Sequence, residues 1–383
     1  MKVLMISTDL ALLGENTSTG DAVTRHRAYG NFVEKLSILV FTKNKNYQPS
    51  ALSPNVSAYP TNSYSFLFFI KNAVALAKEL FSLDKYDLIV CQDPFLTGLT
   101  GYLLKKKYNA RLLVDFHGDF WKNHYWLWEK IWRLPLLALS KIVVKKADAL
   151  RTVSGGIKKK IIQSGFKKIP IKVLPTPVNL EHFKTPDLQT ASSIRQVYPD
   201  KKIILWTGRM TPEKNLPFLV SCFKKIINNY PNVVLLLIGD GPEKNKITQQ
   251  IKSMALDPSV KLLGQINYTQ LLNYFHAADI FVLPSRHESF GKVLLEAGAS
   301  GKPSVASATT GTKEIIIEGE TGFLFPVNKT KKFVEKTLVL LNDENLAHRI
   351  GANAYQHIWT KYNYETSVKN ITAYWQKIAN NKN

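Results

Sequence analysis

Cysteine is scarce in this sequence of 383 residues: only Cys91 and Cys222 occur, and neither stands in a CxxC or Cys/His arrangement. Disulfide frameworks and structural zinc sites need more such residues at defined spacings, so both are excluded and reduced thiols are expected. The sequence also lacks any run of eighteen uncharged apolar residues, which excludes a helix that spans a bilayer. The opening MKVLMISTDL has the pattern of a strand and not of a secretory signal, so we expect a cytoplasmic protein.

Acidic residues are in the minority. The chain has 51 Lys and Arg against 29 Asp and Glu, a formal charge of +22. Residues 1–180 contain 26 basic and 12 acidic residues, and the remainder 25 and 17, so the excess is heavier in the first half. A charge of this size makes a polyanionic partner, either nucleic acid or anionic lipid, worth considering.

Apolar strand-like runs alternate with amphipathic helical stretches along the whole chain, a pattern typical of doubly wound parallel sheets with helices on both faces. Two α/β sheets are predicted. The strands expected in the first sheet are residues 3–7, 37–42, 88–91, 111–116, 149–153 and 172–174. Those expected in the second are 202–207, 233–238, 260–263, 280–283, 303–306 and 322–325.

The segment LPTPVNLEHFKTPDLQT is rich in Pro and Thr and lacks periodicity, which indicates a linker. We therefore predict one domain at 1–180 and a second at 181–363, with a helix over about 364–383. In open α/β sheets ligands lie outside the carboxyl ends of the strands, so a cleft between the two sheets is the expected site.

The segment ADIFVLPSRHESFGKVLLEAGASGKP carries the strongest chemical signal. Glu288 lies in the loop after a strand and Glu296 about two helical turns further on, so the two could touch opposite ends of an extended ligand. Between them the backbone N–H groups of Gly291, Lys292 and Val293 lie at a helix N-terminus, which favours a phosphate or diphosphate. An isolated glutamate pair of this kind is more often solvated, and only its context favours a site.

A second segment, ILWTGRMTPEKN, places Gly208, Arg209 and Lys214 at a strand end. A departing nucleoside diphosphate needs positive charge, which an arginine fork and a nearby lysine can supply in place of a metal. The chain contains no D-x-D carboxylate pair, so no metal and no cofactor are expected. In so basic a protein both cations could also be ordinary surface charges.

Glycines close two further strands of the second half. Gly239 in IGDGP marks a tight turn or a close backbone approach to a ligand. The strand end LLGQI, with Leu263 and Ile266, could present backbone to the edge of a nucleobase.

In the first half a loop from Gly14 to Gly20 leads into a helix from Asp21, whose N-terminus could face a phosphate or sugar. The strand RLLVDF ends in His117, which the strand-end rule places in the cleft. A histidine at a strand end is as often an ordinary loop residue.

These pieces together resemble the family-four glycosyltransferases of the GT-B fold over nearly the whole chain. The resemblance rests on TGRMTPEKN, IGDGP, ADIFVLPS and ESFGKVLLEAGASGKP in this order, and on TVSGGIKKKI and TPVNLEHF around the interdomain crossing. It implies two Rossmann-like domains facing across a cleft, an acceptor-binding one and a nucleotide-sugar-binding one, with the final helix crossing back onto the first.

The resemblance also implies a retaining transfer of a sugar from a UDP- or GDP-linked donor. Arg209 and Lys214 would bind the diphosphate, Glu288 the sugar hydroxyls and Glu296 the ribose, and His117 would lie beside the donor sugar. The backbone from Phe290 to Leu294 would hold sugar and phosphate. The family often has paired glycines where this chain has Gly20 and Asp21, so Asp21 either points away from the diphosphate or serves the acceptor.

The acceptor is expected to be a glycan or a lipid-linked sugar, with Asp21, Asp119 and Trp121 as candidate contacts. Residues 66–81 form a basic amphipathic stretch, and Trp121, Trp126, Trp128 and Trp132 lie among cations, a composition that suits an anionic membrane surface. The tryptophans could equally fill a core or shape an acceptor cleft.

Three alternatives remain open: a nucleotide-sugar epimerase, a scaffold that binds the donor without transferring it, and a nucleic-acid-binding protein. Only the charge favours the last, since no zinc knuckle, helix-turn-helix signal or RNP-like motif accompanies it. No nucleic-acid partner is therefore expected.

Overall fold

The computed structural model describes residues 1–14, 22–43, 46–129 and 133–381, and only the backbone of residues 128 and 129. The chain divides into two compact units. We call Met1–Val178 with Tyr364–Asn383 the N-terminal domain, and Asn179–Asn363 the C-terminal domain.

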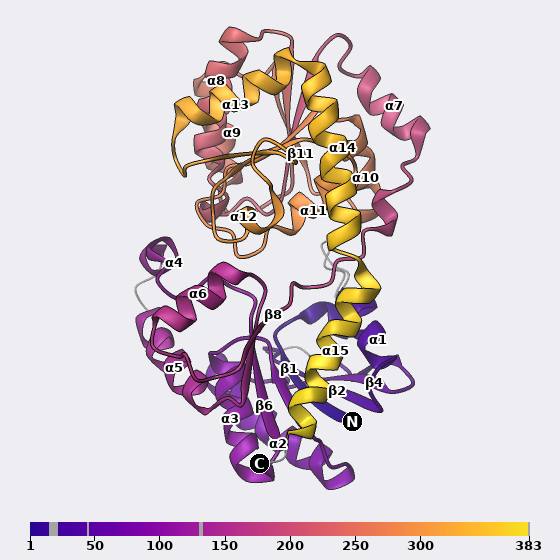
Figure 1. Ribbon diagram of the computed structural model, residues 1–383, viewed down its shortest axis with the longest axis vertical. Coiled ribbons are helices and arrows are strands. Elements are labelled where there is room, and N and C mark those ends of the chain that lie inside the picture. The colour runs from indigo at the N-terminus through magenta and orange to yellow at the C-terminus, as the bar shows by residue number, and fades with distance from the viewer. Residues whose placement is uncertain (15–21, 44–45, 130–132, 382–383) are drawn as a thin grey trace. The chain divides into compact units, whose positions relative to one another are not determined.

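The N-terminal domain is an eight-stranded sheet, as far as its residues are described, with helices on both faces (Figure 1). Its strands are β1 (Lys2–Ser7), β2 (Lys35–Val40), β3 (Ser50–Ser53), β4 (Val56–Pro60), β5 (Leu88–Cys91), β6 (Arg111–Phe116), β7 (Ala149–Thr152) and β8 (Ile171–Val173). Its helices are η1 (Leu10–Leu13), α1 (Ala22–Gly30), η2 (Phe66–Phe68), α2 (Phe69–Leu83), α3 (Leu96–Tyr108), α4 (His124–Glu129), α5 (Arg133–Lys146), α6 (Gly155–Gln163) and α15 (Tyr364–Asn380).

The strand order is β3-β4-β2-β1-β5-β6-β7-β8, and every pairing is parallel except that of β3 with β4. The six strands predicted in this half are confirmed within two residues. The edge strand β3 and its neighbour β4 were missed, because both are short and carry serine and alanine where buried strands carry Val and Ile.

Helix α15 packs on the N-terminal domain although it lies at the far end of the sequence (Figure 1). Val368, Ile371 and Trp375 belong to the same buried cluster as β1, β2 and β5. The rings of Trp375 and Tyr29 of α1 lie 4.9 Å apart, and the Tyr374 hydroxyl donates to the carbonyl oxygen of Leu150 at 3.2 Å. The predicted terminal helix is thus part of this core.

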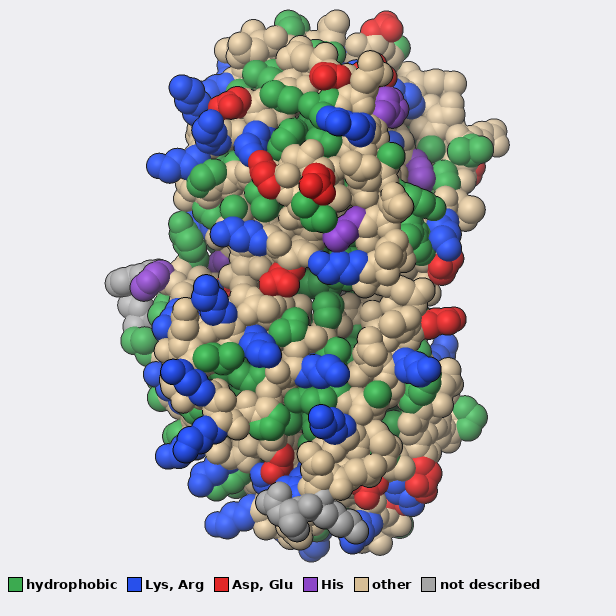
Figure 2. Space-filling model, viewed as in Figure 1, with side chains coloured by type: hydrophobic (Ala, Val, Ile, Leu, Met, Phe, Trp, Pro, Cys, Tyr) green, Lys and Arg blue, Asp and Glu red, His purple; other side chains and the backbone are tan. Residues whose placement is uncertain are grey.

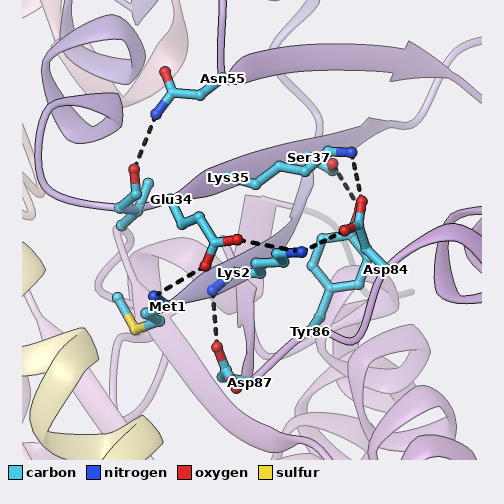
Figure 3. A network of polar contacts seen from close by, with 10 residues as sticks. Met1, Lys2, Glu34, Lys35, Ser37, Asn55, Asp84, Tyr86 and Asp87 are labelled. Carbon is cyan, nitrogen blue, oxygen red and sulfur yellow. Dashed lines mark hydrogen bonds and ion pairs between the residues drawn. The ribbon is translucent and has the colours of Figure 1, made fainter.

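A network of charges ties the amino ends of the strands together (Figure 3). Asp84, after α2, accepts from Lys2 Nζ at 2.6 Å and from Lys35 Nζ at 2.5 Å, which lowers its pKa. Asp87 accepts from the backbone N–H of Lys2 at 2.8 Å. Parallel strands place all their carboxyl ends at the opposite edge, so this network braces the sheet away from the candidate site.

The C-terminal domain is a six-stranded parallel sheet within its described residues, in the order β11-β10-β9-β12-β13-β14. Its strands are β9 (Lys202–Thr207), β10 (Val233–Ile238), β11 (Val260–Gly264), β12 (Ile280–Leu283), β13 (Ser304–Ser307) and β14 (Phe323–Phe325). Its helices are η3 (Glu181–Phe183), α7 (Leu188–Gln196), η4 (Pro212–Lys214), α8 (Leu216–Asn229), α9 (Lys244–Ser253), α10 (Tyr268–Ala277), α11 (Lys292–Ala299), α12 (Thr312–Ile315), α13 (Thr330–Asn342) and α14 (Glu344–Lys361).

The six strands predicted in this half are confirmed within one residue. They are easy to recognise because a parallel sheet covered on both faces needs nearly continuous apolar runs. Every residue of β10, with the sequence VVLLLI, is buried. Both domains therefore have the predicted α/β parallel-sheet class.

Candidate donor site and the His117 cluster

The loops after β9 and β10 meet through their glycines. A Cβ atom built on Gly239, whose φ is +135°, would lie 1.8 Å from the carbonyl oxygen of Gly208. The N–H of Gly208 donates to Ile238 at 3.0 Å, and that of Met210 donates to Asp240 at 2.8 Å. Only a residue without a side chain permits this approach at position 239, and the φ of +152° at Gly208 also favours glycine, so the two glycines fix the backbone around Arg209.

Arg209 is exposed, and its guanidinium makes no hydrogen bond or ion pair with any residue in the described part of the chain. It comes two residues after β9, which is buried from its second residue on, so its position is anchored while its side chain remains available. A guanidinium in this situation can bind a phosphate bidentately.

Lys214 and Glu288, which are 74 residues apart in the sequence, form an ion pair with 2.8 Å between Nζ and Oε2. Their side chains are 21% and 15% exposed, so a ligand can reach both. Asn215 joins their loops: its Nδ2 donates to the carbonyl oxygen of Pro284 at 3.2 Å, and its Oδ1 accepts from Arg286 Nε at 3.2 Å. Sequence reasoning missed Asn215, because its left-handed backbone just before α8 and its two contacts are visible only in the structure.

Helix α11 begins after Gly291, whose φ is +90°. The helix N-terminus expected around Gly291, Lys292 and Val293 is thus confirmed, with Lys292 as its first residue. Its first N–H groups have no partner inside the helix, and those of Lys292 and Val293 are among them. A Cβ on Gly311 would lie 2.4 Å from the backbone nitrogen of Phe290, and the Gly311 N–H donates to the carbonyl oxygen of Glu288 at 2.8 Å. The loop from Glu288 to Gly291 is therefore held by backbone packing.

Glu296 is buried, with 3% of its surface exposed. Its Oε1 accepts from the Tyr268 hydroxyl at 3.3 Å and lies 3.8 Å from Lys292 Nζ. Lys292 also lies 4.9 Å from the centre of the Tyr268 ring. Sequence reasoning missed Tyr268, which follows the β11 strand end where Leu263 and Ile266 lie half-buried.

In the N-terminal domain, His117 follows β6 and is 37% exposed at its side chain. Its Nε2 lies 3.5 Å from Asp115 Oδ2, and its Nδ1 lies 3.2 Å from Thr176 Oγ1. Asp115 in turn pairs with Arg151 at 2.6 Å. Neither Asp115 nor Arg151 was singled out from the sequence, because only the register of β6 with β7 shows that they are opposite each other.

The acceptor candidates Asp119 and Trp121 are buried, with 5% and 4% of their surface exposed. Asp119 pairs with Lys160 Nζ at 2.7 and 2.6 Å, and Trp121 donates to Ser140 Oγ at 2.9 Å. This placement gives both residues contacts within the fold. Gly20 and Asp21 lie outside the described residues, as does Trp132.

Two α/β domains, with glycine-closed strand ends and cationic side chains in the second, are typical of the GT-B class. The solved structure of sucrose-phosphate synthase from Thermosynechococcus elongatus is similar to this chain, with a TM-score of 0.86 at 20% identity. The similarity covers 98% of this chain and 99% of the synthase chain. The structure of Anabaena HepE in complex with UDP-glucose has a TM-score of 0.80 at 19% identity, and the similarity covers 98% of this chain and 100% of the HepE chain. These likenesses show the fold.

Matches to two protein-family models identify the family of this chain. Residues 37–182 match the model of Glycosyltransferase Family 4, and residues 189–357 match that of Glycosyl transferases group 1. The chain belongs to the family-four glycosyltransferases. A curated relative, the capsular polysaccharide biosynthesis glycosyltransferase CapM of Staphylococcus aureus, is 28% identical over 233 residues, which are 59% of this chain and 61% of the relative.

Proposed function

We propose that this protein transfers a sugar from a nucleoside diphosphate sugar to a glycan or lipid-linked acceptor, with retention of anomeric configuration and without a metal. The observation that carries this proposal is the Lys214–Glu288 pair, which lies on the strand-end loops that also carry Arg209 and the start of α11. At this edge of the sheet the cations can bind the diphosphate of such a donor, and the carboxylate can bind the hydroxyls of its sugar.

The cations act on the leaving group. As the bond between the anomeric carbon and the phosphate oxygen breaks, negative charge grows on the diphosphate, and Arg209, Lys214 and the first N–H groups of α11 stabilise it. In this reaction Lys214 moves from Glu288 to the phosphate. Glu288 is then available to accept hydrogen bonds from the sugar hydroxyls.

The acceptor hydroxyl attacks the anomeric carbon on the face from which the diphosphate leaves. Its oxygen forms the new glycosidic bond, and its proton passes to the departing phosphate oxygen. The transfer therefore needs only the donor, the acceptor and residues of this chain.

A uridine donor is supported by the Anabaena relative, which binds UDP-glucose on the same fold. CapM supports a glycan acceptor, since its name assigns it to capsular polysaccharide biosynthesis. A GDP-linked donor remains the alternative that the test includes.

The test incubates the protein with UDP-glucose, UDP-N-acetylglucosamine or GDP-mannose, with glycan and lipid-extract acceptors, in the presence of EDTA. We expect one donor to release its nucleotide in an acceptor-dependent reaction, and NMR to show the donor's anomeric configuration in the product. An inverted product or a strict metal requirement would contradict the mechanism. An isomerised donor without acceptor would instead support the epimerase, and donor binding without release the scaffold.

A second proposal is peripheral attachment to an anionic membrane through η2. Phe66, Leu67 and Phe68 are 62%, 73% and 42% exposed, next to Lys71 on α2. Lysines and arginines are frequent among the hydrophobic side chains that the N-terminal domain presents in Figure 2. By contrast, Trp121 and Trp126 are buried and available to no membrane. Within the described residues no helix combines the length and apolar character that crossing a bilayer requires.

Co-sedimentation with vesicles containing phosphatidylglycerol tests this attachment. Phe66→Ser with Leu67→Ser should reduce binding, whereas Leu188→Ser, which removes an equally exposed leucine from the C-terminal domain, should leave it unchanged. Equal binding to neutral vesicles would refute the proposal.

A further inference from the structure

Asp115 and Arg151 form a buried ion pair directly behind His117. They are register partners on the adjacent strands β6 and β7, and Arg151 Nη1 lies 2.6 Å from Asp115 Oδ2. Their side chains are 5% and 3% exposed. Arg151 Nε also donates to the carbonyl oxygen of Leu174 at 3.0 Å, which fixes the plane of the guanidinium.

The pair reaches His117 through one carboxylate oxygen. Asp115 and His117 are two residues apart at the end of β6, so their side chains leave the strand on the same face. Asp115 Oδ2, already bound to Arg151, lies 3.5 Å from His117 Nε2. That distance is at the long limit of a hydrogen bond, and it is close enough for a direct electrostatic interaction.

The other ring nitrogen faces a weaker partner. Thr176 Oγ1 lies 3.2 Å from His117 Nδ1, and a hydroxyl can donate there or turn away. Because the ring is more than a third exposed, a ligand hydroxyl can take the place of Thr176 without disturbing the buried pair.

The buried pair is not explained by stability. Apolar side chains of similar volume often serve as well as or better than a buried ion pair. Among the residues that the structure describes, Asp115 Oδ1 and Arg151 Nη2 are buried without a hydrogen-bond partner, so the pair is incompletely satisfied there. A charged pair kept under these conditions, at the carboxyl edge of the sheet and beside an exposed histidine, indicates a role in setting the state of that histidine.

We propose that Asp115 and Arg151 are positioning residues that hold His117 as a neutral ring, with its proton on Nε2 toward Asp115 and with Nδ1 free to accept from a sugar hydroxyl. This inference deepens the proposed glycosyl transfer, in which His117 is the residue that meets the substrate. Asp115 orients the ring, and Arg151 keeps the carboxylate ionised and the ring uncharged.

The charges around His117 agree with this arrangement. The His117 side chain is 37% exposed, but the loss of hydration over its covered part lowers its pKa; Asp115 opposes the shift, and Arg151 and Arg25 of α1 add to it. Burial alone would raise the pKa of Asp115, but Arg151 and His117 outweigh burial and lower it. A neutral ring beside an ionised carboxylate is the expected state near pH 7.

The tautomer can be measured directly by NMR on protein with ¹⁵N-labelled histidine, with the His117 signals assigned from His117→Gln. We expect the Nε2–H form to dominate in the unmodified protein. A ring that is protonated at pH 7, or protonated on Nδ1, would overturn the proposal.

Substitutions at two positions separate the roles. Asp115→Asn should shift the tautomers toward an even mixture and lower kcat by roughly tenfold, the scale of one hydrogen bond to a charged group, while the donor KM changes little. Arg151→Gln should raise the pKa of His117 and move the acid limb of the kcat profile to higher pH, and Arg151→Lys should restore it. Unchanged tautomers and pH profiles in both variants would refute the pair's role.

Asp148→Asn is the matched control, because Asp148 pairs with Lys105 and Arg111 away from His117. It should alter neither the tautomer nor the pH profile. Failure of the proposed function is a separate outcome: the unmodified protein would show the Nε2–H ring and the Arg151-dependent titration, yet bind no UDP- or GDP-sugar and release no nucleotide.

Discussion

The strand ends of the two domains carry charge in different ways. In the N-terminal domain Asp115 and Arg151 are almost fully buried and bind each other behind an exposed ring. In the C-terminal domain Lys214 and Glu288 are part-exposed, and Arg209 is exposed with no partner among the described residues. The first arrangement fixes the state of one side chain, whereas the second offers charges that a ligand can bind directly.

Breaking the buried pair should have the largest effect on stability. Arg151→Met leaves the Asp115 carboxylate buried without its cation, which typically costs about 3–5 kcal/mol. Urea unfolding measures this loss. Asp115→Leu combined with Arg151→Met should recover most of it, and a double variant as unstable as the single one would show that packing, not charge, is responsible.

Removing charge from the C-terminal pair should affect rate more than folding. Glu288→Gln should reduce turnover by on the order of hundredfold or more, as the loss of a preorganised polar contact to the reacting group does. Arg209→Ala should act likewise through the diphosphate, while Glu296→Ala should mainly weaken donor binding. Initial rates of nucleotide release measure these effects. The control Glu335→Gln, which breaks an exposed pair with Lys332, should be inert.

The backbone contact of the donor loops should tolerate no side chain. Gly239→Ala places a Cβ atom against the Gly208 carbonyl and should cost about 2–3 kcal/mol, mostly through strain. Gly301 also has a positive φ, +69°, but nothing lies within 4 Å of an added Cβ, so Gly301→Ala reports the cost of a positive φ without a backbone contact. Equal losses of melting temperature in the two variants would show that the loops can separate freely.

The amino-edge network should have the smallest effect. Asp84→Asn weakens two partly exposed contacts and should cost about 1 kcal/mol, less at high salt. Because the folded pKa of Asp84 is lowered, its contribution is present above the unfolded value near 4 and disappears as the pH falls through the folded value. The difference from the unmodified protein should therefore shrink in urea melts below pH 4.

Most strands could be predicted from the sequence, because a sheet that is covered on both faces needs continuous apolar runs such as those of β9 and β10. The short strands β3 and β4, which carry serine and alanine, gave no such signal. At the site, the sequence predicted the strand-end residues Arg209, Lys214 and Glu288, but it did not predict the ion pair between Lys214 and Glu288.

What the sequence could not provide is lateral register and burial. Asp115 and Arg151 are 36 residues apart and meet only because β6 and β7 align them. Trp121 and Trp126 lie in a basic, aromatic segment whose composition suits a membrane surface as well as a core, and only the packing shows them to be buried.

The most direct test of the central claim is a thermal-shift titration with UDP, GDP and their sugar conjugates, on the unmodified protein and on Arg209→Ala. A ligand at a hundred times its dissociation constant adds roughly 2.7 kcal/mol of stability. We predict a clear rise in melting temperature with the nucleotides of one base and its loss in Arg209→Ala. No rise with any nucleotide, or a rise that Arg209→Ala retains, would contradict the donor site described for the C-terminal domain.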